Sequence, residues 1–504
     1  MTRRMGSTLL SGGCLNIIGR PGTGKTTLLE SLYAQLVSTI DPASVLVLTP
    51  DRDHADVLRN RLQLPADAVL SSAPARSLAS FAYGIARAAH TTRTGEDLEF
   101  ISGADQDVFL ADLLGGHELG HSRGPAWPAE ITAEVRSTSA FRTEVRDALN
   151  RVMEFDFGMR TPSPSSETSE HVFDYGRSAL DRVLADEPDP RWQAVAEILD
   201  EYLGIMSMPG YGGIDSATVL ALAAFEIFRE PAEVTAGRSW TFAPDRVPTV
   251  VLADGVQDFP AASWGILEQL RARGSAIALF GSPETVTGRF HGADASIIDR
   301  AAIEASFESV VLERQWDVDP ALATVIDGFG ARITTRWSIG HMPRPRPSED
   351  AAVSPAAESA ESLPAAPPEE LTPAAVETPV ETHVFEGSAS GHRYLARRIM
   401  NFVEQGHSWS DVALVCRNSS NARAIANELR ASGVSIATLM QPLNVDPATA
   451  PLLDLLSVSP DFDDDESIAE LALSLAGSIY VRLDPVQIRR FRRAVRRQFP
   501  APNS

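Results

Sequence analysis

The stretch Gly19-Arg-Pro-Gly-Thr-Gly-Lys-Thr26 constrains the fold of this chain more than any other, because it fits the phosphate-binding pattern G-x-x-x-x-G-K-[ST]. Apolar residues 15–18 precede it, and leucines at helical spacing follow it. This order predicts a strand, a glycine-rich loop and a helix. In such a loop the backbone N–H groups point inward and the helix adds the positive end of its dipole, so the main chain can bind phosphate.

The pattern gives each of its positions a predicted role at a nucleotide. Lys25 would reach the β and γ phosphates, and Thr26 would ligate the Mg²⁺ that accompanies ATP. The alternative is a glycine-rich turn that matches by chance, and the flanking strand and helix patterns argue against it. The predicted cofactor-binding residues are Gly19, Arg20, Pro21, Gly22, Thr23, Gly24, Lys25 and Thr26.

Length and composition bound the remaining possibilities. A chain of 504 residues is too long for one hydrophobic core, so we expect several domains. The net charge of -23 argues against coating nucleic acid by bulk electrostatics, so any DNA contact must come from a local groove. Cys14 and Cys416 lie far apart, which suits a reducing cytoplasm and excludes a disulfide framework. No run approaches about 18 apolar residues, so we expect no membrane partner.

Four apolar runs predict the strands of a sheet that is buried on both faces. Helical patterns separate these runs, and such alternation is typical of a doubly wound parallel sheet. The predicted fold class is therefore α/β, of the P-loop NTPase (RecA-like) kind. Asp254 closes one strand at its carboxyl end, where P-loop NTPases use an acid to hold Mg²⁺. The four runs span residues 44–50, 249–254, 276–281 and 309–312.

Changes of pattern along the chain predict the domain boundaries. We expect an ATP-binding domain over residues 1–340, with a helical subdomain inserted at about 97–240. Residues 341–382 are rich in Pro, Ala, Glu and Ser, which predicts a disordered linker. A further strand at 412–416, followed by a helix, predicts that 383–504 form a partial second motor domain.

Several segments, in order, resemble motifs of the UvrD/Rep branch of superfamily 1 DNA helicases, and more closely the AdnAB-type helicase–nuclease subunits of actinobacteria. LTPDRDHADVLRNRL resembles a motif in which Thr49 would contact the DNA backbone. ARSLASFAYGIAR resembles the next DNA-contacting motif, with Ser77 where the family usually has threonine. FGSPETVTGRFHGAD resembles the segment in which Phe290 would stack on a DNA base.

The segment VVLADGVQDF is similar to the family's L-V-D-E-x-Q-D and carries Asp254, Gln257 and Asp258 in register. The resemblance implies an ATP-dependent DNA helicase subunit in which Lys25, Asp254 and Gln257 act in catalysis, while Thr26 and Asp254 hold Mg²⁺. It also implies single-stranded DNA or a duplex end as substrate, a second helicase or nuclease subunit as partner, and a place in DNA repair or recombination.

Three departures from the family pattern predict impaired hydrolysis. Gly255 stands where the family has the glutamate that orients the attacking water, and glycine has no group that could do so. Thr285 replaces the glutamine that senses the γ-phosphate, and Asp317 replaces an arginine that points toward it. The family's later motifs have no counterpart before Ser504, so the resemblance covers about the first half of such a subunit.

Three functions remain open from the sequence. The first is a helicase subunit that binds ATP and holds DNA for an active partner while its own motor has degenerated. The second is an active helicase whose second half is encoded separately. The third is a P-loop ATPase or kinase unrelated to nucleic acid. The basic stretch from Arg489 to Arg497 is either a DNA-facing patch or an ordinary solvated face.

Overall fold

The structure is a computed structural model in which two compact units are distinguished, Met1–Val380 and Glu381–Ser504. It describes residues 1–64, 73–159, 175–186, 188–206, 214–215, 219–220, 223, 247–288, 292–316, 320–330, 346–347, 380–436, 449–456, 472, 475–478 and 480–498.

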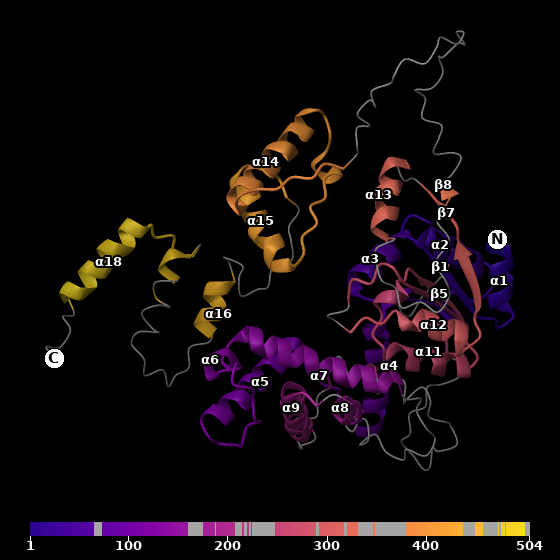
Figure 1. Cartoon of the computed structure of the whole chain (residues 1–504), viewed down its shortest axis with the longest axis horizontal. Helices are drawn as coiled ribbons and strands as arrows, with labels where there is room; N and C mark the ends of the chain where they lie inside the picture. The colour runs from indigo at the N-terminus through magenta and orange to yellow at the C-terminus, as the bar shows by residue number, and fades with distance from the viewer. Residues whose placement is uncertain are drawn as a thin grey trace, which may run out of the picture. The chain divides into compact units, whose positions relative to one another are not determined.

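A six-stranded parallel sheet forms the centre of the first unit and confirms the predicted α/β fold class (Figure 1). Its strand order is β3-β2-β4-β5-β1-β6. Each predicted apolar run became a strand, because a strand that is covered on both faces needs apolar side chains at nearly every position. The strands are β1 (Leu15–Gly19), β2 (Val45–Thr49), β3 (Ala75–Ser77), β4 (Val250–Asp254), β5 (Ala276–Gly281) and β6 (Glu308–Leu312).

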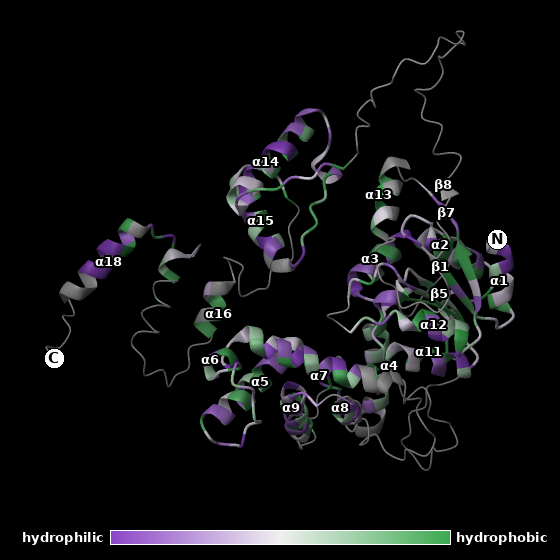
Figure 2. Cartoon of the chain, viewed as in Figure 1, coloured by the Kyte–Doolittle hydropathy of each residue, from purple (hydrophilic) through white to green (hydrophobic). Residues whose placement is uncertain are grey.

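Helices cover both faces of this sheet (Figure 2). The four inner strands, β1, β2, β4 and β5, therefore send side chains into two cores, one on each face. Ile17 of β1 packs into one core and the adjacent Ile18 packs into the other. The Ile17 side is covered by α1 (Thr2–Leu10), α2 (Lys25–Val37) and α3 (Arg52–Arg61). The Ile18 side is covered by α4 (Leu78–Thr94), α11 (Ser263–Ala272) and α12 (Ser296–Ile303).

Between β3 and β4 the chain forms a helical region with a hydrophobic core of its own, as the sequence predicts. A reciprocal capping box between Ser102 and Asp105 fixes the start of its first helix. Inside the region, the amide Nε2 of Gln106 lies 3.2 Å from both Tyr202 Oη and Asp215 Oδ2. The helices are α5 (Gly103–Glu118), α6 (Ala133–Arg136), α7 (Ser139–Met159), α8 (Tyr175–Asp186) and α9 (Pro190–Met206).

Short elements complete the first unit. Within the stretch predicted to be a linker, β8 (Arg346–Pro347) pairs in parallel with β7 (Arg314–Gln315). The others are the 3₁₀ turns η1 (Pro42–Ser44) and η5 (Val256–Asp258), and helix α13 (Pro320–Gly330).

The second unit contains α14 (Ser388–Glu404), the 3₁₀ turn η8 (Trp409–Asp411), α15 (Ser419–Ala431), α16 (Ala450–Leu456) and α18 (Pro485–Gln498). Helix α15 follows residues 412–416 as predicted. The predicted strand at 412–416 was wrong, because no described residue pairs with it and Val415 is 92% exposed. A strand requires a ladder partner, and an apolar pentapeptide cannot provide one for itself.

Candidate nucleotide-binding site

The glycine-rich loop joins β1 to α2 at the carboxyl edge of the sheet. Gly24 has φ 81° and caps α2, a left-handed conformation that favours glycine. The hydroxyl of Thr23 donates to the carbonyl oxygen of Arg20 at 2.8 Å and closes the loop on itself. The predicted cofactor-binding residues 19–26 therefore form one compact turn that ends at the N-terminus of a 13-residue helix. This geometry suits an anion.

Lys25 lies inside this turn. Its Nζ donates to the carbonyl oxygens of Gly19 at 2.7 Å and Arg20 at 2.9 Å. Burial lowers the pKa of Lys25 to about 8, and the carboxylate of Asp254 opposes that shift. Lys25 is also the only lysine of the chain. The single side-chain ammonium of the protein is therefore placed where phosphate would bind.

Asp254 and Thr26 come together although 228 positions separate them in sequence. The Thr26 hydroxyl donates to Asp254 Oδ2 at 2.9 Å, and the Gly255 N–H donates to Oδ1 at 3.0 Å. Burial raises the pKa of Asp254, while these two hydrogen bonds and Lys25 oppose the shift. Two adjacent protein oxygens beside a phosphate cradle fit Mg²⁺, which takes most of its remaining ligands from water and phosphate.

Gly255 follows Asp254 in a left-handed conformation, with φ 66° and ψ 31°. A Cβ added to it would lie 3.2 Å from Pro50 Cγ and 3.3 Å from Cδ, tighter than ordinary contact. Both the backbone conformation and the neighbouring proline thus disfavour any larger residue here.

The side chains of Gln257 and Asp258 connect β4 to the segment after β5. Gln257 Oε1 accepts from the Ser282 N–H at 3.0 Å, and its Nε2 donates to Asp258 Oδ2 at 3.2 Å. Asp258 Oδ1 accepts from the N–H groups of Thr287 at 2.8 Å and Gly288 at 2.9 Å. Both ends of the Gln257 amide are therefore engaged in holding that segment in place.

An ion pair that the sequence did not reveal closes one side of the glycine-rich loop. Arg20 Nε lies 3.1 Å from Glu284 Oε2, and its second nitrogen donates to Oε1 at 3.2 Å. The two side chains are only 14% and 15% exposed. Thr285, next in sequence, donates its hydroxyl to the Ser282 carbonyl oxygen at 3.1 Å.

Trp316 is a second residue that sequence reasoning missed. Its backbone N–H donates to the Gly22 carbonyl oxygen at 2.8 Å, and a Cβ added to Gly24 would lie 3.6 Å from its ring. Gln315 Nε2 donates to the Pro21 carbonyl oxygen at 3.2 Å. The ring is 44% exposed, with the Arg314 guanidinium 4.1 Å from its centre. The only sequence signal for this contact was that Trp316 is an aromatic residue shortly after a predicted strand, and such strands end at the sheet edge where the glycine-rich loop lies.

The predicted DNA-contacting residues lie elsewhere, and two of them have local partners. Thr49 is buried at the end of β2, and its hydroxyl donates to the Asp51 carbonyl oxygen at 2.8 Å. Ser77 is buried and caps α4 by accepting from the Ser80 N–H at 3.2 Å. Phe290 and Asp317 lie outside the described residues. The structure therefore brings together Lys25, Thr26 and Asp254 at one site, and it places Thr49 and Ser77 opposite each other on the paired strands β2 and β3.

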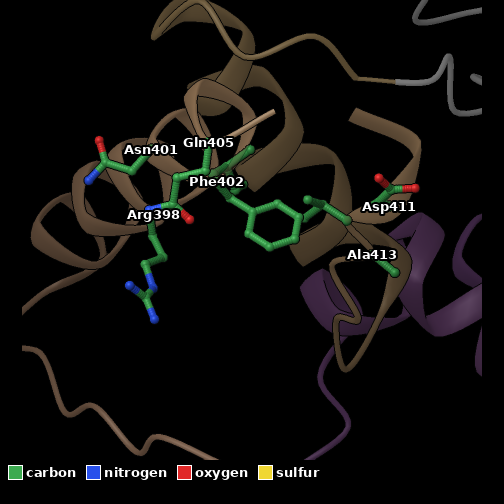
Figure 3. A pocket seen from close by; sticks show the side chains of 8 residues that line it. Arg398, Asn401, Phe402, Gln405, Asp411 and Ala413 are labelled. Carbon is green, nitrogen blue, oxygen red and sulfur yellow. The ribbon is translucent and has the colours of Figure 1, made fainter. Parts of the chain in front are cut away.

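The second unit contains an open hollow of about 520 Å³ beside α14 (Figure 3). Phe402 extends from the helix toward the segment that carries Asp411 and Ala413. No glycine-rich loop borders this hollow, so it does not repeat the phosphate-binding chemistry of the first unit. Within the described part of the chain, no helix is both long and apolar enough to cross a bilayer.

Comparison with known proteins gives one match. Residues 4–305 match the profile of the UvrD/REP helicase N-terminal domain, a range that begins in α1, includes the glycine-rich loop and β4, and ends just after α12. A search of curated proteins finds no match.

Proposed function

The chain belongs to the UvrD/REP helicase family, and from this premise we propose that it binds ATP and holds DNA while hydrolysing ATP poorly on its own. The observation that carries the proposal is the pairing of an intact phosphate and metal cradle with Gly255, which directly follows Asp254 in a conformation that disfavours a side chain. Members of this family are ATP-dependent DNA helicases.

Nucleotide binding is supported by the contacts of residues 19–26. Lys25 would exchange its bonds to the loop carbonyl oxygens for bonds to the β and γ phosphates. Thr26 and Asp254 would hold Mg²⁺, which neutralises phosphate charge when bound. The exposed ring of Trp316 beside the loop is a candidate surface for the base.

Poor hydrolysis is supported by the groups that are missing. At position 255 no atom could accept a proton from water or orient it. Thr285 is short, and its hydroxyl is engaged with Ser282. In related phosphoryl transfer, loss of one charge-stabilising arginine costs about 10³- to 10⁵-fold in rate, so an aspartate at position 317 would add a large penalty.

We also propose the domain division predicted from the sequence: an ATP-binding domain over 1–340 with a helical subdomain at 97–240, a linker at 341–382, and a partial second motor domain at 383–504. Helicase movement requires two motor domains to close around ATP. The proposal therefore includes a second helicase or nuclease subunit, of the AdnAB type, acting with this chain in cytoplasmic DNA repair.

For DNA, we propose that the surface near Thr49 and Ser77 contributes through its backbone and exposed neighbours, because both hydroxyls are engaged inside the fold. Phe290 keeps its proposed role as a base-stacking residue on resemblance alone. Gln257 is proposed to link the nucleotide site to the segment that leads to Phe290, given its bond to Ser282.

The decisive experiment measures ATP binding and ATP turnover separately, with and without single-stranded DNA. We expect the wild-type chain to bind ATP with little turnover, and Lys25→Ala to lose binding by about tenfold or more, since charge-assisted hydrogen bonds contribute about 1.5–3 kcal/mol each. Arg271→Ala removes an exposed cation from α11 and serves as the matched control. Brisk DNA-stimulated hydrolysis by the purified chain would contradict the proposal. An active helicase completed by a separate polypeptide predicts turnover only after that polypeptide is added.

A further inference from the structure

Helix α18 presents a row of exposed arginines to solvent. Arg489, Arg490, Arg492 and Arg493 are all exposed. At 3.6 residues per turn these four positions fall within about 160° of the helix circumference, so they share one side. Figure 2 shows hydrophilic colouring along this helix.

The opposite side of α18 carries two apolar residues, of which Ile488 faces its own chain and Phe491 is 60% exposed. Ile488 approaches Gly477 of the preceding segment, since a Cβ added to Gly477 would lie 3.9 Å from Ile488 Cδ1. The helix start is fixed by Asp484, whose Oδ1 accepts from the N–H groups of Val486 at 2.7 Å and Gln487 at 2.8 Å. The position of this first turn sets which way the arginines face.

Three of the four arginines of this face have no acidic partner among the described residues. Among the described residues, Arg490, Arg492 and Arg493 form no ion pair, although the chain carries 67 acidic residues against 44 basic ones. A cationic face on an acidic protein is complementary to an anionic partner. Arginine in particular matches phosphate, because its planar guanidinium can donate two parallel hydrogen bonds to one phosphate.

We propose that the arginine face of α18 is a nucleic-acid-binding surface, separate from the motor motifs, that contacts the phosphate backbone of single-stranded DNA without reading its sequence. The choice of DNA rests on the family's substrate and not on the nucleotide site. A membrane surface fits less well, because the described apolar side of α18 is limited to Ile488 and Phe491, whereas helices that lie on membranes present a broad apolar face.

The test compares DNA affinity across a salt series, using a fluorescent oligonucleotide and anisotropy. The variant Arg490→Gln/Arg492→Gln/Arg493→Gln should bind about 10- to 100-fold more weakly at about 50 mM salt, and its slope of log K against log salt should be less steep by about 2, because each phosphate contact on a single strand contributes about 0.7. The corresponding triple lysine variant keeps the charges and should retain most of the salt dependence.

A matched control removes the same net charge elsewhere, through Arg3→Gln/Arg123→Gln/Arg271→Gln at exposed positions of the first unit. It should bind DNA like the wild type. Unchanged DNA affinity in the α18 variant, or equal losses in both triple variants, would overturn the proposal. So would loss of binding to anionic phospholipid vesicles with DNA affinity intact, which would assign the face to membranes.

ATP binding, measured in parallel, reports on the nucleotide site independently. If the wild type binds no DNA while it binds ATP, this inference fails and the nucleotide proposal stands.

Discussion

The candidate nucleotide site contains the only lysine in 504 residues, Lys25. The loop carbonyl oxygens of Gly19 and Arg20 hold this amine, and burial lowers its pKa to about 8. An ordinary lysine has a pKa near 10.4, so a much larger fraction of Lys25 is neutral near neutral pH. Amine chemistry therefore reports on this site alone, apart from the N-terminal amino group.

Competitive labelling with acetic anhydride across a pH series should show this shift. We expect the labelling rate of the peptide that contains Lys25 to rise with a midpoint at about pH 8, and saturating ATP with Mg²⁺ to suppress it. Mass spectrometry separates this peptide from the labelled N-terminus, and Lys25→Arg provides the blank. A midpoint near that of a free lysine, about 10.4, would show that the amine is not desolvated.

Restoring a carboxylate at position 255 should not restore turnover. Gly255→Glu places a side chain on a left-handed backbone beside Pro50, which should lower the free energy of unfolding by about 1–2 kcal/mol. Urea denaturation and DNA-stimulated ATP turnover measure the two effects. Gly255→Asn is the control, because asparagine tolerates this conformation and should lose less stability. A Gly255→Glu variant with full stability and brisk turnover would refute this account.

Single residues were predictable where the signal is local. The glycine-rich loop has a fixed spacing, so residues 19–26 could be placed from the sequence. The Arg20–Glu284 ion pair and the approach of Trp316 could not, because each depends on strands that meet only in the folded sheet. The left-handed conformation of Gly255 could not be predicted either. The sequence shows only that position 255 lacks a carboxylate.

At the level of elements, strands with buried partners were predicted well and the isolated one was not. Residues 276–281 were predicted and observed with the same bounds, because β5 lies between β4 and β1 and is apolar throughout. Residues 412–416 have a similar composition but no described partner. An apolar composition favours burial, whereas a strand also requires a neighbouring strand that shares its hydrogen bonds.

Helix α7 carries a partly buried acid, Glu154, that should make stability depend on pH. Burial raises the pKa of Glu154 to about 8, the Asp215 carboxylate adds to this, and Arg151 opposes it. The folded protein therefore holds this proton more tightly than the unfolded chain does. The stability that the protonated acid contributes is present below its unfolded pKa of about 4.3 and is lost as the pH rises through about 8.

Glu154→Gln should remove this dependence. Relative to the variant, the wild type should lose roughly 2–4 kcal/mol of unfolding free energy between about pH 5 and about pH 9. Urea denaturation at the two pH values measures the difference. Glu144→Gln, on an exposed position of the same helix, is the matched control and should follow the wild type. Parallel pH profiles for all three proteins would show that Glu154 ionises as it does in water.

The whole molecule consists of two units, and the complete nucleotide cradle lies in the first of them. Its sheet closes a core on each face without any residue of the second unit. ATP binding should therefore not require residues beyond 380.

Limited proteolysis tests this independence. We expect early cleavage within the proline- and alanine-rich residues 341–382, and a fragment ending there that binds ATP about as tightly as the intact chain, within about twofold. Size-exclusion chromatography isolates the fragment, and the Lys25→Ala protein treated in the same way is its control. Loss of ATP affinity on cleavage would mean that the second unit contributes to the site.

The backbone at Gly255 also bears on how such a subunit could change over time. A single base change can convert a glycine codon to a glutamate codon. The backbone at Gly255, however, has a left-handed conformation and lies against Pro50. Reversion would need the turn and its proline neighbour to change together, with little benefit from either change alone. Under the proposed loss of hydrolysis, that step would be difficult to regain, and selection would instead act on whatever the bound nucleotide still does.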